Sequence, residues 1–376
     1  MSAPAPIAPA ADLRRLSDVV ELFSQQTVLL LGDFVADEFV FGEISRVSRE
    51  APVLILRHRE TQLLPGGGAN AASNLADLGA RVLPVGAIGD DETGETLRKY
   101  FQTRHVDISG LTRVRGWVTP TKTRFLAGWT HTGRQQVLRV DREPSAELPP
   151  ESVKSLVRAA RDRLARSSAT IISDYGYGSA TPEIAAAIRG RVNWPAPATL
   201  DSRYRLHEYA GLGLAAATPN EAEIEAAHYT EIAGNNNYLE RLARRTITRM
   251  GIGALVVTRG RDGMTIFERG HAPRSLAVFG SDQAVDVTGA GDTVIAAFTL
   301  AIASGANVFE AAQIANYAGG IVVMKPGTAT ATRAELLDAI GADATGATPA
   351  PLPAVLKSQA RRARVKPGRA RNTSRR

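Results

Sequence analysis

Helical and extended segments alternate through the middle of the sequence, and this alternation constrains the fold more than any other feature of the chain. The segment Glu151–Arg166 places apolar residues at helical intervals, and the apolar run Ala169–Ser173 follows it. The runs Ala198–Leu200 and Ala254–Thr258 have the same character, and the helical segment Leu239–Met250 precedes the second of them. Parallel strands need a crossover connection, which a helix usually supplies. The sequence therefore predicts an α/β fold with a mainly parallel sheet covered by helices on both faces.

Polar residues recur where the predicted strands end. Asp33 and Asp37 come after the apolar run Thr27–Leu31, which has the composition of a buried strand. The residues that follow predicted strands in this way are Asp33, Asp174, Asp201, Asn220 and Thr258. One such residue could be a helix cap. Because open α/β sheets bind their ligands at the carboxyl ends of the strands, five of them together predict a shared cleft.

The segment Val285–Thr293 is typical of a phosphate site at the start of a buried helix. Gly289 and Gly291 allow a sharp turn that points N–H groups into one cavity, and the apolar run Val294–Ala303 predicts a helix with its positive end there. Asp292 falls in the first turn, so a base stands beside a site for anions. This pairing suits phosphoryl transfer, because the N–H groups stabilise the moving group while the base accepts the acceptor's proton. The alternative is an ordinary helix start with an acidic residue in its first turn.

A second glycine-rich segment, Pro65–Asn70, precedes a helical stretch of small residues that ends at Gly79. Its glycines allow a ligand to lie against the backbone. Asn70 and Asn74 stand one helical turn apart, so both amides could hydrogen-bond a polyol. The alternative is a tight turn packed on a neighbouring element, with the asparagines as caps.

Two further regions predict a small sheet outside the main core. Phe39–Arg59 contains β-prone pieces and few helix signals. Thr119–Asp141 has the pattern of a hairpin in which Lys122 and Arg124 share one face, with Arg139 on the second strand. Converging Lys and Arg side chains can bind a phosphate. The alternative is a solvated edge strand that carries charges for solubility.

Missing motifs exclude several classes of protein. No lysine follows a glycine, so there is no Walker A loop, and the protein-kinase motifs and an HExxH zinc motif are absent as well. A dinucleotide fingerprint needs a third glycine where Val294 stands. The chain has no cysteine, which excludes disulfides and thiol chemistry and fits a cytoplasmic location. No window approaches the roughly 18 apolar residues of a membrane span, and the N-terminus lacks the features of a secretory signal.

The positive charge of the chain is concentrated near its C-terminus. Residues 357–376 contain nine basic residues and no acidic one, so residues 1–356 carry −2 of the total charge of +7. A segment of this composition cannot bury a core. We therefore expect residues 343–376 to form a disordered basic tail that contacts nucleic acid only non-specifically, if it does so. Residues 1–12 are also expected to be disordered, which leaves one folded domain over residues 13–342.

The sequence resembles the ribokinase-like (PfkB) carbohydrate kinases from Thr27 to about Ile340. It carries both family signatures in order, Gly66-Gly67-Gly68-Ala69-Asn70 and Asp286-Val287-Thr288-Gly289-Ala290-Gly291-Asp292-Thr293. Within the family it is most similar to the kinase domain of bacterial D-glycero-β-D-manno-heptose 7-phosphate kinases. The segments that carry this similarity are Ser45–Val53, Lys122 with Arg124, Gln135–Asp141 and Ser173-Asp174-Tyr175. The resemblance implies a three-layer α/β domain with a small β lid, formed here by roughly residues 33–59 and 113–141.

The resemblance also implies roles for individual residues. Asp292 would be the catalytic base, and the anion hole would be formed by Gly289, Ala290 and Gly291. The residues implied to hold the acceptor sugar are Asp33, Gly66, Gly67 and Asn70, with Lys122, Arg124 and Arg139 from the lid. The residues implied to bind ATP are Asn220, Glu223, Thr258, Gly260, Gly263 and Asn316, with Glu223 acting indirectly on Mg²⁺. Backbone ligands of a monovalent cation such as K⁺ would come from Asp286 and Thr288.

Two departures from the heptose kinases bear on the acceptor. Tyr177 stands in the loop after Asp174-Tyr175 where they usually carry lysine, and Arg203 replaces the lysine of their Asp-Pro-Lys-Gly sequence. The predicted function is ATP-dependent phosphorylation of a sugar hydroxyl, most specifically the anomeric hydroxyl of a heptose 7-phosphate, by a homodimer paired through its lids. The alternatives are a kinase of an unphosphorylated sugar or nucleoside and a catalytically silent regulatory protein that binds a sugar or nucleotide.

Overall fold

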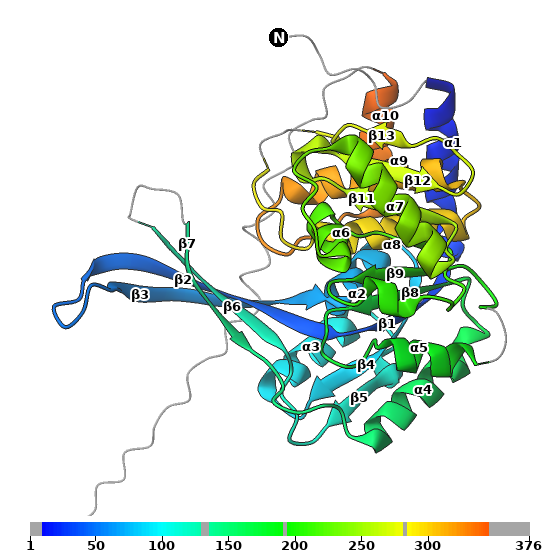
Figure 1. Cartoon of the computed structure of the whole chain (residues 1–376). Helices are drawn as coiled ribbons and strands as arrows, with labels where there is room; N and C mark the ends of the chain where they lie inside the picture. The colour runs from blue at the N-terminus through cyan, green and yellow to red at the C-terminus, as the bar shows by residue number, and fades with distance from the viewer. Residues whose placement is uncertain (1–9, 129–134, 191–193, 281–283, 346–376) are drawn as a thin grey trace, which may run out of the picture.

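The computed structural model describes residues 10–128, 135–190, 194–280 and 284–345, and its main element is a nine-stranded sheet (Figure 1). The strand order is β13-β12-β11-β10-β9-β8-β1-β4-β5. The pairings from β5 to β11 are parallel, whereas β12 and β13 at one edge run antiparallel. The predicted α/β fold is thereby confirmed. Its strands are β1 (Thr27–Gly32), β4 (Arg81–Gly89), β5 (Leu111–Val114), β8 (Ala169–Asp174), β9 (Ala198–Ser202), β10 (Ala216–Ala217), β11 (Ala254–Thr258), β12 (Met264–Glu268) and β13 (Arg274–Leu276).

Helices cover both faces of this sheet because its central strands are apolar on both sides. Along β1, Val28 and Leu30 point into a core shared with α1, α2, α8, α9 and α10, whereas Leu29 and Leu31 point into a core shared with α4 to α7. The two-residue period of a strand produces this division, and three layers result. The helices are α1 (Ala10–Glu21), α2 (Gly68–Asp77), α3 (Glu92–Thr103), α4 (Pro150–Leu164), α5 (Pro182–Arg189), α6 (Glu221–His228), α7 (Asn236–Met250), α8 (Ala290–Ala303), α9 (Val308–Val323) and α10 (Arg333–Ala344).

A four-stranded sheet in the order β3-β2-β6-β7 extends away from the main sheet as a lid (Figure 1). β2 (Phe34–Val47) and β3 (Leu54–Gly67) form one antiparallel hairpin, and β6 (Thr121–Gly128) and β7 (Gln135–Arg142) form the other. The hairpins join through the parallel pairing of β2 with β6. The predicted small sheet is confirmed with different bounds. β3 runs past the expected end at residue 59, and β5, expected in the lid, belongs to the main sheet because it pairs with β4.

The described residues begin and end in two helices, α1 and α10, that pack against each other. α1 starts at Ala10, so part of the N-terminal segment expected to be disordered is helical. α10 continues to Ala344, just past the domain boundary expected at residue 342. The rest of both expected disordered segments lies outside the described residues. Among the described helices, none has the length and apolar character needed to cross a membrane.

Candidate active site

The polar residues that were predicted to share a cleft lie where the central parallel strands end. Asp33 follows β1, Asp174 ends β8, and Asp201 lies in β9 opposite Ser173 of the neighbouring strand. α8 packs on β8 and β9, and this brings its first turn, with Asp292, to the same edge. The Asp292 side chain is only 2% exposed. The sheet therefore gathers carboxylates from three strands and one helix into a single site.

Asp292 is held by two hydrogen bonds from distant parts of the chain. Asn70 Nδ2, in α2, donates to its Oδ2 at 2.9 Å, and the Tyr175 hydroxyl, in the loop after β8, donates to its Oδ1 at 2.8 Å. Each carboxylate oxygen thus has one donor that fixes its orientation. An oriented carboxylate at this place has lone pairs left to accept the proton of a bound hydroxyl.

The pKa of Asp292 is suited to this role. Burial raises the pKa to about 7, and the charges of Asp37 and Glu223 raise it as well, while the hydrogen bonds from Asn70 and Tyr175 lower it. A general base is most effective when its pKa lies near the working pH, because it is then both ionised and basic. The surroundings of Asp292 therefore favour proton transfer near neutral pH.

The start of α8 has the geometry that the glycine motif predicts. Gly289 caps the helix in the left-handed conformation, with φ of 79°. A Cβ at this position would lie 2.4 Å from Asn70 Nδ2, so close packing on Asn70 requires glycine. Gly291 is exposed, and as a first-turn residue its N–H has no intrahelical acceptor. The Ala290 N–H bonds weakly to Val287 O at 3.3 Å. This arrangement is compatible with the predicted anion hole, which stays a prediction.

Asn74 does not have the ligand-binding role considered for both asparagines. It is fully buried, and its Nδ2 donates to Asn70 O and Oδ1 at 3.1 and 3.2 Å. Its Oδ1 accepts from the Thr293 hydroxyl at 3.0 Å and from Ala331 N at 3.3 Å. These partners leave nothing for a polyol, so that expectation is corrected for Asn74. Its function is to fix Asn70 against α8.

Asp33 was predicted to hold a sugar hydroxyl, but its carboxylate organises the loop after β8. Oδ2 accepts the backbone N–H groups of Tyr175 and Tyr177, both at 2.9 Å, and Oδ1 accepts that of Ser179 at 2.7 Å. Burial raises the pKa of Asp33, Asp174 raises it further, and the three N–H groups oppose the shift. At 1% exposure, Asp33 is better suited to placing the two tyrosines than to touching a sugar. The sugar contact itself stays an untested prediction.

Asp174 has the same function for the loop after β9. It accepts from Gly176 N, the hydroxyls of Ser202 and Tyr209, and two nitrogens of the Arg205 guanidinium. Two buried aspartates therefore fix the two loops that line the cleft.

Asp37 was placed with Asp33 at the ligand-binding end of the first strand, but the sequence assigned it no individual contact. It is 4% exposed, and it accepts from Arg124 Nη1 at 2.5 Å and from the Thr328 hydroxyl at 2.9 Å. A Cβ on Gly66 would lie 2.5 Å from Asp37 Oδ2, which explains that glycine. Gly67, with φ of 54°, packs against the Tyr175 ring. The signal that could have found Asp37 is its place at the junction of main sheet and lid, beside the glycine motif.

The three predicted lid cations lie near the cleft, and each already has an anionic neighbour. Lys122 Nζ donates to the Tyr177 hydroxyl at 2.8 Å and lies 3.5 Å from Asp141 Oδ2. Arg139 binds Asp141 through two nitrogens, at 2.7 and 2.5 Å, and Arg124 binds Asp37. Burial lowers the pKa of Lys122, and the hydrogen bond from Arg139 lowers that of Asp141 to about 2. These cations are therefore ordered in advance by carboxylates.

The predicted ATP residues form a second group, most of them at the start of α6 and after the end of β11. Asn220 caps α6, and its side chain and that of Glu223 form a reciprocal capping box at 2.8 and 2.9 Å. Thr258 bridges to Asn220 across the strand ends. The loop after Thr258 contains two glycines with positive φ, 55° at Gly260 and 80° at Gly263. A Cβ on Gly263 would lie 2.0 Å from Leu276 O.

Asn316 lies behind this loop and supports it. Its Nδ2 donates to Ala277 O at 2.7 Å, and the residue is 4% exposed. A nucleotide contact by Asn316 stays a prediction, and the contact present in the structure is with the segment that Gly263 packs against.

Three carboxyl groups lie close enough in the cleft to affect one another. Burial raises the pKa of Asp201 well above its usual value, and Glu223 and Asp292 add to the effect. Burial likewise raises the pKa of Glu223. Such a group suits a divalent cation, since Mg²⁺ typically takes one or two carboxylates together with substrate phosphates. Among the described residues, no group of three or more acidic or histidine side chains is arranged to hold a metal by itself.

The predicted cation ligands, Asp286 and Thr288, lie beside the anion hole in a loop tied to a second loop. Asp286 Oδ1 accepts Thr288 N at 2.9 Å, and its Oδ2 accepts Gly327 N at 3.0 Å. The Asp286 side chain thus joins the loop before α8 to the segment after α9. The cation contact of the two carbonyl groups stays a prediction.

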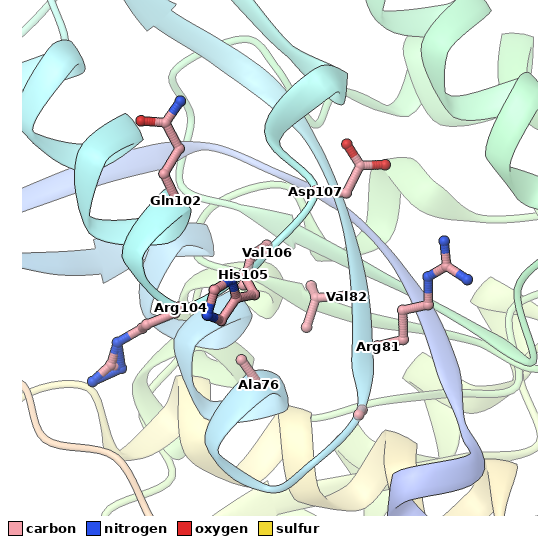
Figure 2. A pocket seen from close by; sticks show the side chains of 9 residues that line it. Ala76, Arg81, Val82, Gln102, Arg104, His105, Val106 and Asp107 are labelled. Atoms are coloured by element: carbon pink, nitrogen blue, oxygen red, sulfur yellow. The ribbon is translucent and has the colours of Figure 1, made fainter.

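A surface pocket of about 430 Å³ lies apart from the cleft (Figure 2). It is at the amino end of β4, and none of the predicted site residues lines it. The side chains of Arg81, Arg104 and Asp107 project in different directions around it (Figure 2). Arg104 Nη1 donates to Asp77 Oδ1 at 3.3 Å. Its polar groups therefore do not converge on a ligand.

The sheet, the lid and the aspartate at a helix N-terminus together define a phosphotransferase with a ribokinase-like fold. Solved structures agree on the fold. Arabidopsis thaliana ribokinase in complex with ribose and ATP superimposes with a TM-score of 0.66 at 19% identity, over 84% of this chain and 98% of that chain. Escherichia coli phosphofructokinase-2 in complex with substrates and products gives a TM-score of 0.67 at 18% identity, over 84% and 98%.

Residues 35–335 match the pfkB family of carbohydrate kinases. The chain is 37% identical over 324 residues to the Bifunctional protein HldE of Desulfatibacillum aliphaticivorans, covering 84% of this chain and 63% of that protein. It is 38% identical over 337 residues to the protein of the same name from Gluconacetobacter diazotrophicus, covering 87% and 67%. The chain thus spans about two thirds of the length of these curated relatives. It belongs to the pfkB family of carbohydrate kinases, and it is a phosphotransferase with an alcohol group as acceptor.

Proposed function

We propose that this kinase transfers the γ-phosphoryl group of ATP to a phosphorylated sugar, and that the acceptor is the anomeric hydroxyl of a heptose 7-phosphate. The observation that carries the transfer is the buried Asp292 carboxyl at the start of α8, oriented by Asn70 and Tyr175. The choice of acceptor is supported by the relatives named Bifunctional protein HldE, by the resemblance to the heptose kinases, and by the cations of the lid.

In the proposed reaction the acceptor hydroxyl gives its proton to Asp292 while its oxygen forms a bond to the γ-phosphorus. The bond from that phosphorus to the β–γ bridging oxygen breaks, and ADP leaves with the electron pair. The Gly291 N–H at the positive end of α8 stabilises charge on the moving group. Because the pKa of Asp292 is about 7, a large share of the enzyme has the base ionised at neutral pH.

The acceptor would lie between Asp292 and the lid. We assign its hydroxyl contacts to Asp37 rather than Asp33, because the Asp33 oxygens are occupied by three backbone N–H groups. The glycine at position 66 leaves room for the sugar beside Asp37. The phosphate of the acceptor would bind Lys122 and Arg139, which then exchange their contacts with Asp141 for stronger ones to a dianion.

A kinase of an unphosphorylated sugar or nucleoside is the second candidate, and the pairing of the lid cations favours it. Arg124 is paired with Asp37 at 2.5 Å, and Lys122 and Arg139 share Asp141. A cation that a carboxylate already neutralises attracts a phosphate less strongly. A neutral acceptor would leave all of these pairs intact.

On the nucleotide side, the capping box of Asn220 and Glu223 and the Gly260–Gly263 turn would bind the phosphates and base of ATP. Asp201 and Glu223 would hold Mg²⁺ together with the phosphates. The ion would neutralise negative charge on the β- and γ-phosphates. A monovalent cation such as K⁺ would bind backbone carbonyls near Asp286 and Thr288.

We further propose that the protein pairs into a homodimer through its lids. The strands of the lid and the turn between β2 and β3 expose several apolar side chains: Val47, Val53, Leu54, Val137, Leu138 and Val140, each 40% to 57% exposed. A sheet that exposes apolar residues along its edge strands is commonly covered by another chain.

An assay that couples ADP release to NADH oxidation, run over a panel of sugars and sugar phosphates, tests the proposal. The expected result is the highest kcat/KM with heptose 7-phosphate and little turnover of the unphosphorylated heptose. A preference for a neutral sugar or nucleoside would select the second candidate. An absence of phosphorylation across the panel would leave a binding protein and would refute the kinase assignment.

A further inference from the structure

Arg203 follows β9 in a loop whose backbone is fixed, and within the part of the chain that the structure describes its side chain has no polar partner. Its backbone N–H donates to Asp174 O at 3.0 Å, and the preceding Ser202 and, two residues further on, Arg205 bind the Asp174 carboxylate. Arg203 is exposed, and among the described residues its guanidinium makes no hydrogen bond or ion pair. Its recorded neighbour is the ring of Tyr204, 5.5 Å from the guanidinium carbon.

Arg203 directly follows β9 and comes two residues after Asp201, which lies opposite Ser173 at the end of β8. Its charge acts on Asp201 and Glu223, opposing the rise that burial causes in the pKa of each. It also acts on Lys122 in the lid, adding to the lowering that burial causes in the pKa of that residue. Arg203 therefore stands within electrostatic reach of the proposed metal carboxylates and of the acceptor-binding lid.

The loop that carries Arg203 also lies against the loop that positions the base. The Tyr204 ring is 3.3 Å from the position of a Cβ on Gly176, whose φ is 85°. Gly176 stands next to Tyr175, which donates to Asp292. The loop that carries Arg203 thus lies beside the loop that carries Tyr175, at the edge of the sheet where the proposed phosphoryl transfer takes place.

We propose that Arg203 is a catalytic residue that binds the γ-phosphoryl group of ATP and stays bound to it as it moves to the acceptor. This inference rests on the proposed direction of transfer, from ATP to a sugar hydroxyl. The planar guanidinium donates two parallel N–H bonds to two oxygens of one phosphoryl group, which a lysine cannot do. Negative charge spreads over those oxygens during transfer, and a cation at this place stabilises it. Arg203 is available for this role because, unlike Arg124 and Arg139, it pairs with no carboxylate of the described residues.

Nucleotide binding without acceptor gives the first test. Titration of the full chain with Mg²⁺ and either β,γ-imido-ATP or ADP compares Arg203→Ala with the parent protein. The expected result is an affinity for the triphosphate analogue lowered about 10-fold or more, with ADP affinity changed less than about 2-fold. An equal loss for both nucleotides would place Arg203 on the α- or β-phosphate, and no loss for either would remove it from nucleotide binding. Both outcomes would overturn the proposal.

Turnover gives the second test, with heptose 7-phosphate or the best acceptor of the panel. Arg203→Ala should lower kcat about 100-fold with the KM of the acceptor nearly unchanged, and Arg203→Lys should recover part of the loss. Arg142→Ala is the matched control, because Arg142 is an exposed lid arginine 3.6 Å from Glu38 and has no role in the site. A rise confined to the KM of phosphorylated acceptors would assign Arg203 to the acceptor and overturn the proposal. The nucleotide comparison stands even if heptose 7-phosphate is not the acceptor, so the two proposals can fail separately.

Discussion

Replacing Tyr175 with phenylalanine should shift the pH dependence of the enzyme. The substitution removes the hydroxyl that donates to Asp292 Oδ1 at 2.8 Å and keeps the ring that packs against Gly67. A hydrogen bond to a charged group contributes about 1.5–3 kcal/mol, and one pKa unit corresponds to about 1.36 kcal/mol. Losing this bond should therefore raise the pKa of Asp292 by about 1–2 units. Starting from a pKa of about 7, the variant's base would ionise at roughly pH 8–9.

The assay is the pH profile of kcat/KM between about pH 5 and 10. Activity needs the ionised base, so kcat/KM falls as the pH drops below the pKa of Asp292. At pH 7 the Tyr175→Phe variant should be about 5- to 50-fold slower than the parent, with most of the loss recovered at pH 9.5. Tyr317→Phe is the matched control, because it removes the hydroxyl bonded to Asp343 at 2.5 Å, away from the cleft. An acid limb that stays in place in Tyr175→Phe would refute the tuning of Asp292 by this bond.

Three further substitutions have defined outcomes. Asp292→Asn should raise the free energy of unfolding, measured by urea titration, by about 2–4 kcal/mol at pH 8 but not at pH 4. The pKa of Asp292 in the folded protein, about 7, exceeds its value in the unfolded chain, so the parent protein loses stability as the pH rises from 4 to 7. Equal stability at pH 8 would contradict the raised pKa. Arg139→Ala, which removes a proposed phosphate ligand, and Arg124→Ala, which removes the partner of Asp37, should each lower kcat/KM for a sugar phosphate about 10- to 150-fold, with the KM for ATP nearly unchanged. Full efficiency in both would contradict the proposed acceptor site in the lid. Gly289→Ala should lose about 1–3 kcal/mol in thermal unfolding and most turnover, because its φ is 79° and a Cβ would meet Asn70; parent-like values would refute that packing.

The fold could be predicted from local patterns because each of them reflects a single element. Apolar runs such as Thr27–Leu31 and helical spacing such as that of Glu151–Arg166 are fixed by which faces of an element are buried, and the structure contains both elements. The start of α8 was equally predictable, because glycine, helix and Asp292 are adjacent in the chain. The bounds of the lid were less predictable, because β5 belongs to the main sheet through its pairing with β4 and not through its own composition.

Hydrogen-bond partners in the site could not be predicted, because they connect residues far apart in sequence. Asn70 reaches Asp292 across 222 positions, and Asp33 reaches Ser179 across 146. Sequence spacing placed Asp33 at a strand end but could not show that three backbone N–H groups would occupy its oxygens. For the same reason the pairing of Arg124 with Asp37 could not be predicted, although Asp37 was placed at the ligand-binding end of the first strand.

The most direct test of the catalytic account is Asp292→Asn measured for both turnover and ATP binding. The asparagine has nearly the same shape and keeps a group that Asn70 can hydrogen-bond, but it cannot accept the proton of the acceptor. The account predicts a kcat lowered at least about 100-fold across the pH range, with the affinity for ATP changed less than about 2-fold. Turnover within a few fold of the parent protein would contradict the role of Asp292 as the base.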